Sequence, residues 1–153
     1  VLRAGTLDFE PITRITYPKE GENTPSLWLV LDEVVDPQNF GALLRSAYFL
    51  GGASPGKENE TNASIGIMVC SKNSAPASAI SSAASAGALE LCQVYSTNNL
   101  PRTLSAANEE GWRILGAAAS APSGMNVECF DLQDVKVGES QPPTILVLGS
   151  EGH

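Results

Sequence analysis

Three residues near the start of the chain have types and a spacing that suit ligand binding. Asn39, Gly41 and Arg45 stand in the stretch DPQNFGALLR, where a polar loop leads into an apolar segment. The side-chain oxygen of Asn39 can cap a helix, and Gly41 lets another backbone or a ligand approach closely. We expect Arg45 to be half-buried among leucine and alanine neighbours, where an arginine usually has an anionic partner. Spacing alone leaves that partner open between a structural carboxylate and a bound phosphate.

A second candidate stretch is LGSEG, which runs from Leu148 to Gly152 after an apolar segment. Glycines on both sides of Ser150 and Glu151 suit the close approach of a ligand to the backbone. Glycines also end strands for purely structural reasons. The pattern alone is therefore weak evidence for a site.

Other kinds of chemistry find less support in the sequence. His153 is the only histidine, which argues against Ser-His-Asp catalysis and against a multi-histidine metal site, so we expect no metal. Asp32 and Glu33 can form an acid/base pair, but strand ends of an acidic chain often carry solvated carboxylates. The stretch from Gly51 to Lys57 matches the front of a phosphate-binding loop but follows a helix and lacks the required hydroxyl residue. No GxGxxG follows the first strand, which disfavours a dinucleotide enzyme.

Composition limits the possible partners of this chain. Its 153 residues are enough for one globular domain, and 42% of them are hydrophobic. The net charge of -8 argues against a broadly cationic nucleic-acid binder, so any RNA site must be local or borrowed from a partner. The apolar runs are too short for a membrane span. The three cysteines are widely spaced, which favours a reducing compartment over a disulfide framework.

The elements that position these residues alternate between strand and helix. Residues 27–35 have the apolar pattern of a buried strand, residues 36–40 form a loop, and residues 41–50 have helical spacing. Further strands are expected at residues 64–71, 92–96, 112–119 and 144–150, and further helices at residues 76–91 and 104–111. This alternation predicts an α/β fold with a parallel sheet and helices on both faces. Ligands of such sheets gather at the carboxyl ends of the strands, where both candidate stretches lie.

Together the two stretches resemble the SpoU, or TrmH, branch of the SPOUT superfamily of RNA ribose 2′-O-methyltransferases. The first family motif, Asn-x-Gly followed four residues on by Arg, is present as Asn39-Phe40-Gly41 and Arg45. The second is present as ILVLGSEGH at residues 145–153. Between them, SAGALE at residues 85–90 is similar to the middle segment of the family. The variant LDEVVDPQNFGALLRSAYFLG is most similar to mitochondrial members that methylate a guanosine of large-subunit ribosomal RNA.

The resemblance implies a fold and a cofactor. The fold is a parallel α/β domain whose C-terminal segment is threaded into a trefoil knot, and the protein is a homodimer with S-adenosylmethionine bound in the knot. Gly149, Ser150 and Gly152 would line the methyl-donor pocket. The loop near Ala118 would lie by the adenosine.

The resemblance also implies an RNA-facing site. Asn39, Arg45 and Glu151 would face the ribose of ribosomal RNA, and the location would be mitochondrial. A sulfonium methyl is already an activated electrophile, so the reaction needs the ribose 2′-oxygen in line with it and relieved of its proton. Arg45 stays protonated at ordinary pH, so we assign it to holding a phosphate and stabilising negative charge on the 2′-oxygen.

The sequence departs from the family pattern at its end. The third motif, a Ser-Leu-Asn segment that completes the knot and the cofactor pocket, does not follow motif two. We therefore expect residues 26–153 to be a SPOUT methyltransferase domain without its C-terminal knot segment, and residues 1–25 to be a linker or a remnant of an N-terminal domain. The main hypothesis is an S-adenosylmethionine-dependent 2′-O-methyltransferase of large-subunit ribosomal RNA. The alternative is a non-catalytic RNA-binding or ribosome-assembly protein of the same fold.

Overall fold

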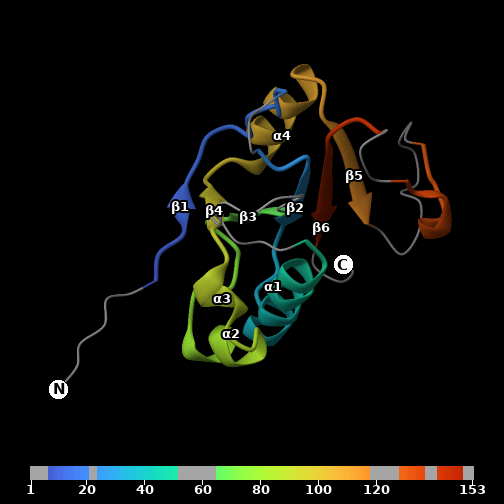
Figure 1. Cartoon of the computed structure of the whole chain (residues 1–153). Coiled ribbons are helices and arrows are strands. Elements are labelled where there is room, and N and C mark those ends of the chain that lie inside the picture. The colour runs from blue at the N-terminus through green and yellow to red at the C-terminus, as the bar shows by residue number, and fades with distance from the viewer. Residues whose placement is uncertain (1–6, 21–23, 52–64, 118–127, 137–140, 150–153) are drawn as a thin grey trace.

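The computed structural model describes residues 7–20, 24–51, 65–117, 128–136 and 141–149. Its centre is a six-stranded sheet in the order β1-β4-β3-β2-β6-β5, and every neighbouring pair of strands is parallel (Figure 1). The strands are β1 (Glu10–Pro11), β2 (Leu27–Leu31), β3 (Ile65–Cys70), β4 (Val94–Thr97), β5 (Arg113–Ala117) and β6 (Thr144–Leu148). The predicted parallel α/β fold is confirmed. The knot implied by the resemblance involves the chain after residue 149, which lies outside the described residues.

Helices cover both faces of this sheet, as predicted, with three on one face and one on the other. The first three are α1 (Pro37–Gly51), α2 (Ala79–Ala84) and α3 (Ala88–Leu91), and the fourth is α4 (Leu100–Glu109). Side chains of a strand alternate between the two faces. In β3, Ile67 and Val69 therefore join the core beneath α1, whereas Met68 joins the core beneath α4. None of the described helices is long and apolar enough to cross a membrane.

The helix α1 begins four residues earlier than the sequence pattern predicts, at Pro37 instead of Gly41. The cap is Asp36, whose Oδ1 accepts a hydrogen bond of 3.0 Å from the Gln38 N–H. The Asp36 carbonyl also accepts the first helical hydrogen bond, from the Phe40 N–H at 3.0 Å. Proline is favoured at the first helical position because it has no N–H to leave unpaired. Proline thus begins this helix, although the sequence analysis placed it in a loop.

Replacing Asp36 with alanine should lower the stability of the protein by about 1 kcal/mol, because the capping carboxylate is lost. In a domain of this size that corresponds to a melting temperature lower by about 2–4 °C, measured by circular dichroism. The control is Gln38→Ala, which removes an exposed side chain of the same helical turn and should leave the melting temperature unchanged. Equal melting temperatures for the two variants would show that Asp36 does not cap α1.

Two further boundaries differ from those predicted. The single helix expected at residues 76–91 is two helices, because the chain turns at Gly87 with a φ of 85°, a conformation that glycine adopts freely. The helix expected from Leu104 begins at Leu100, where Asn99 accepts a hydrogen bond from the Arg102 N–H at 3.1 Å. The first error therefore arises from a glycine turn inside the apolar pattern, and the second from an asparagine that caps a helix ahead of its apolar positions. The five strands that were predicted agree with β2 to β6 to within four residues at each end, whereas β1 was not predicted.

The N-terminal segment interpreted as a linker or remnant carries β1. Glu10 and Pro11 pair with Tyr95 and Ser96 of β4. Farther along, the side chain of Ile15 is 1% exposed in the core beneath α4. This segment is therefore held against the sheet edge and contributes to the core.

Candidate functional site

The carboxyl ends of the central strands form a hydrogen-bonded rim, which lies where the sequence analysis expected a site. At the end of β2, the Asp32 N–H donates to the Leu148 carbonyl of β6 at 2.9 Å. On the other side, Asn73 Nδ2, just after β3, donates to Glu33 Oε1 at 3.2 Å. Glu33 has a φ of 57°, which is uncommon for a residue other than glycine. Its carboxylate thus joins two strand ends, and this contact gives it a structural role that the acid/base interpretation did not foresee.

Asn39 lies in the first turn of α1, and its side chain is exposed. From the sequence, Asn39 was proposed to cap this helix. That proposal is wrong, because Asp36 occupies the capping position. No described residue bonds to the Asn39 side-chain amide, which is therefore available to a ligand.

Arg45 is exposed, and the expectation that it is half-buried is wrong. The helix turns Leu44 into the core, where its side chain is 0% exposed, and this rotation points the next residue toward solvent. Among the described residues, no carboxylate pairs with the Arg45 guanidinium. Of the two partners left open by the sequence, a structural carboxylate is not found in the described part of the chain.

Asn39, Ala42 and Arg45 follow one another at three-residue steps along the exposed face of α1. Each step rotates about 60° around the helix axis and rises about 4.5 Å. The methyl group of Ala42 therefore lies between the amide and the guanidinium. Because it is small, the surface between these two groups carries no large side chain. We call these three residues the α1 face.

Gly149 follows β6 at the same rim and is exposed. A Cβ built on Gly149 would meet no atom within 4 Å, and the same holds for Gly116 near the end of β5. Ala117, paired with Leu148 across the two strands, is also exposed. Within the described part of the chain, this small-residue platform leaves the backbone open to a flat ligand. The other predicted residues, Ala118, Ser150, Glu151 and Gly152, lie outside the described residues.

Nucleophilic and metal chemistry find little support in the described part of the chain. Burial raises the pKa of the half-buried Cys92 thiol to about 11, so it is protonated near neutral pH and is a poor nucleophile. Within the described ranges, no group of three or more His, Cys, Asp or Glu residues is arranged to hold a metal ion. The groups near the rim that a ligand can contact are the Arg45 guanidinium, the Asn39 amide and the backbone at Gly149.

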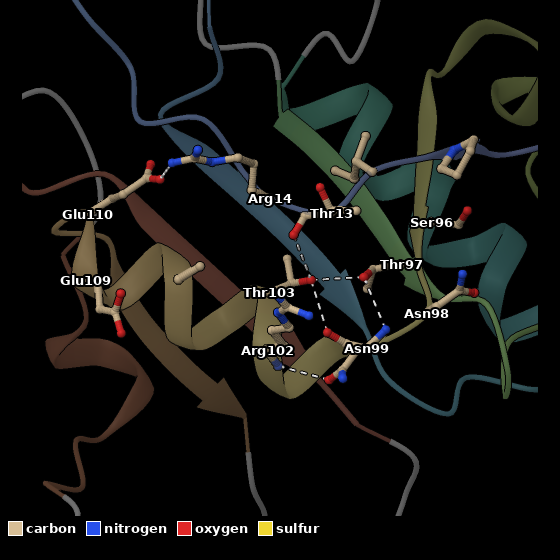
Figure 2. A pocket seen from close by; sticks show the side chains of 13 residues that line it. Thr13, Arg14, Ser96, Thr97, Asn98, Asn99, Arg102, Thr103, Glu109 and Glu110 are labelled. Atoms are coloured by element: carbon tan, nitrogen blue, oxygen red, sulfur yellow. Dashed lines mark hydrogen bonds and ion pairs between the residues drawn. The ribbon is translucent and has the colours of Figure 1, made fainter.

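A cavity of about 700 Å³ lies farther along the rim, at the end of β4 (Figure 2). Its polar lining includes Asn98, Asn99 and Arg102. The sequence analysis did not single out these residues. The signal was nevertheless present, since the stretch TNNLPR places two asparagines and a proline where a strand gives way to a helix, much as DPQNFG places one asparagine and a proline.

Comparison with known proteins identifies relatives over most of the chain. A model of the SpoU rRNA Methylase family matches residues 26–153. The human protein named rRNA methyltransferase 1, mitochondrial, is 36% identical over 153 residues, which cover 95% of this chain and 40% of the human protein. The Schizosaccharomyces pombe protein of the same name is 33% identical over 130 residues, covering 85% of this chain and 39% of that protein.

Solved structures show the same likeness. A TrmH-family protein from Porphyromonas gingivalis matches with a TM-score of 0.60 and 27% identity, covering 86% of this chain and 45% of that one. An rRNA methyltransferase from Sinorhizobium meliloti matches with a TM-score of 0.64 at 19% identity, which supports the fold alone, and covers 95% of this chain and 46% of that one. The chain thus spans less than half the length of each of these relatives.

Proposed function

The chain belongs to the SpoU rRNA Methylase family, and we propose that it is part of an S-adenosylmethionine-dependent enzyme that methylates a ribose 2′-hydroxyl, on a guanosine, in large-subunit ribosomal RNA. The observation that supports this most directly is the α1 face. It presents an exposed arginine that has no carboxylate partner among the described residues and an exposed asparagine that does not cap the helix, and α1 follows β2, the strand paired with β6. The human and Schizosaccharomyces pombe relatives named as mitochondrial rRNA methyltransferases agree with this proposal. They also favour a mitochondrial location.

The platform at the ends of β5 and β6 fits S-adenosylmethionine. The cofactor contains flat and flexible parts that need a backbone free of side chains, and Gly116, Ala117 and Gly149 provide such a surface. We propose that Gly149, Ser150 and Gly152 hold the methyl donor and that the chain near Ala118 lies by its adenosine. S-Adenosylmethionine supplies a methyl group on a sulfonium, which is already an activated electrophile.

The residues of α1 position and stabilise the RNA. The Arg45 guanidinium binds an RNA phosphate and stabilises the negative charge that develops on the 2′-oxygen as the hydroxyl loses its proton. The Asn39 amide orients the ribose by hydrogen bonding, and the small side chain of Ala42 lets the RNA backbone approach the helix. We propose that Glu151 faces the ribose together with Asn39 and Arg45. Because guanidinium remains protonated at any ordinary pH, Arg45 does not act as the base.

We also propose that the protein acts as a homodimer, as the resemblance implies. Phe49 and Leu50, at the C-terminal end of α1, are 84% and 85% exposed. Exposed large apolar side chains next to one another are typical of a surface that is covered in an assembly. Light scattering of the wild-type protein and a Phe49→Asp variant tests this, since the variant should shift the mass toward the monomer.

The test of the proposed function is transfer of labelled methyl from S-adenosylmethionine to a transcript of large-subunit ribosomal RNA by the full-length polypeptide. The label should appear on one guanosine ribose, which then resists alkaline cleavage at that position. Absence of transfer to any ribosomal RNA would overturn the proposal.

The net charge of -8 favours one alternative, a non-catalytic RNA-binding or ribosome-assembly protein. Binding of S-adenosylmethionine separates the two functions. A full-length protein that binds ribosomal RNA but has no affinity for the methyl donor would support the assembly function.

Replacing Gly149 with alanine should weaken binding of S-adenosylmethionine about 10-fold, because the new methyl group projects into the space proposed for the cofactor. The melting temperature should not change, since the Cβ would meet no protein atom within 4 Å. Titration calorimetry of the full-length protein measures the affinity. Ser105→Ala, an exposed change on α4, is the control and should bind as the wild type does. Wild-type affinity of the Gly149 variant would exclude Gly149 from the cofactor site.

A further inference from the structure

The cavity at the end of β4 has three walls that are far apart in the sequence. One wall is the segment of residues 11–14, the second is the end of β4, and the third is α4 (Figure 2). The buried hydroxyls of Thr97 and Thr103 lie 2.9 Å apart and join the second wall to the third. Thr103 Oγ1 also lies 3.4 Å from the Thr13 carbonyl, which brings in the first wall. The cavity is half-open to solvent, and interior hydrogen bonds hold its three walls together.

Its polar side chains leave hydrogen-bond donors available. Asn98 Oδ1 accepts from Ser71 Oγ at 2.5 Å, and Asn99 Oδ1 accepts from the Arg102 N–H at 3.1 Å. In both amides the oxygen is occupied, and no described residue accepts a hydrogen bond from either Nδ2 group, so both can donate to a ligand. The Arg102 side chain is exposed, and among the described residues no carboxylate pairs with its guanidinium. These three donors lie together on the side of the cavity where the central strands end.

The acidic groups of the lining lie away from these donors. Glu110 forms an ion pair with Arg14, and this hydrogen bond holds the pKa of the Glu110 carboxyl below its usual range, so the pair is neutral overall. Glu109 lies seven residues beyond Arg102 on α4, which is about 10 Å along the helix axis. The end of the cavity near Arg102 therefore suits a phosphate, whereas the far end does not.

The cavity is continuous with the rim that carries the proposed active site. The Ser71 N–H donates to the Thr97 carbonyl at 2.9 Å, which joins the end of β3 to the end of β4. The next link is Asn73 with Glu33, and the last is Asp32 with Leu148. Hydrogen bonds thus connect the cavity, one strand end at a time, to the end of β6. Lys72 is exposed in the middle of this path and adds a second cation.

We propose that this cavity binds one unpaired nucleotide of the RNA substrate, next to the segment that contains the methylated ribose. The Arg102 guanidinium contacts its phosphate, and the amides of Asn98 and Asn99 donate to acceptors on its base or ribose. A volume of about 700 Å³ is in the range of sites that hold one nucleotide-sized ligand. The mixture of one cation with several neutral donors fits a nucleotide better than it fits a bare anion. This inference rests on the proposed function, because it takes RNA to be the substrate of this chain.

The test measures RNA binding by the full-length protein, using a ribosomal RNA fragment with and without its unpaired flanking nucleotides. Arg102→Gln should weaken binding of the longer fragment about 10-fold and reduce the slope of log affinity against log salt by about one. Binding of the shorter fragment should not change. Asn98→Ala should have a smaller effect of the same kind. The control is Lys19→Gln, which removes an exposed cation outside the cavity and should bind both fragments as the wild type does.

Each outcome separates this inference from the proposed function. If methyl transfer occurs but Arg102→Gln binds both fragments as the wild type does, the inference is overturned and the proposed function stands. If Arg102→Gln shows the selective loss but no methyl is transferred, the nucleotide site stands and the enzymatic function fails. A wild-type protein with no affinity for either fragment overturns both. If Arg102→Gln weakens binding of both fragments equally, Arg102 contributes only general electrostatic attraction to RNA. That result would also overturn the inference.

Discussion

Replacing Arg45 with alanine in the full-length protein should slow methyl transfer to large-subunit ribosomal RNA about 100- to 1000-fold, the usual effect of removing one donor that stabilises a developing oxyanion. The guanidinium is exposed and has no carboxylate partner among the described residues, so its removal leaves no buried charge unpaired. Stability should therefore be unchanged. Binding of S-adenosylmethionine should be unchanged as well, because the proposed cofactor platform lies at the ends of β5 and β6 and not on α1.

Two variants of the same helix sharpen this test. Ser46→Ala removes an exposed hydroxyl next to Arg45, one whose single partner among the described residues is the Ala42 carbonyl, and it should keep the wild-type rate. Arg45→Lys keeps the positive charge but loses the planar fork that binds phosphate in two places, so an intermediate rate is expected. Single-turnover transfer of labelled methyl at saturating RNA measures all three variants. A wild-type rate for Arg45→Ala would show that Arg45 has no role in methyl transfer.

The sheet could be predicted from sequence because its signals are local and strong. The apolar runs of β2, β3 and β6 are bounded by polar or glycine-rich stretches, and that pattern alone indicates buried parallel strands. The ends of the helices could not be predicted as well. Helix α1 begins at Pro37 because Asp36 caps it, and α4 begins at Leu100 because Asn99 caps it. In both helices the capping residue lies in a polar stretch that looks like a loop, so apolar periodicity detects the helix one turn late.

The placement of the candidate site residues in the fold could be predicted only in part. The positions of Asn39 and Gly149 at the carboxyl rim follow from the motifs and from the parallel sheet. The exposure of Arg45 was missed, because apolar neighbours in sequence do not show which of them faces the core. The cavity near Asn98 was missed because one of its walls is the segment of residues 11–14, and no local pattern shows that this segment pairs with β4. Long-range contacts of this kind are what sequence periodicity leaves out.

Gly41 shows how the packing of the fold determines the position of the α1 face. It is buried on the side of α1 that contacts α2. A Cβ added there would lie 2.6 Å from Ala84 Cβ and 2.7 Å from the Ser81 carbonyl oxygen. Carbon atoms in contact are normally about 3.5–4.0 Å apart, and backbone atoms cannot rotate aside as a long side chain can. The sequence analysis expected Gly41 to admit another backbone or a ligand, and the structure shows that the backbone is that of α2.

Replacing Gly41 with alanine should therefore force α1 away from α2. We expect a loss of stability of about 1–2 kcal/mol, since overpacking outweighs the better helix propensity of alanine. This corresponds to a melting temperature lower by about 2–8 °C, and Gly116→Ala is the matched control for stability because its Cβ would meet no atom within 4 Å.

The larger effect of Gly41→Ala should be on catalysis, although Gly41 itself is buried. Asn39 and Arg45 stand on the same helix, so a shift of α1 moves both relative to the cofactor platform at the end of β6. A misplacement of about 1 Å can slow a reaction about 100-fold. We therefore expect methyl transfer at 25 °C, where the variant remains folded, to fall far more than the loss of stability explains. A variant that melts earlier but reacts at the wild-type rate would show that the reaction tolerates movement of α1 against the sheet, and would weaken the assignment of the α1 face to the active site.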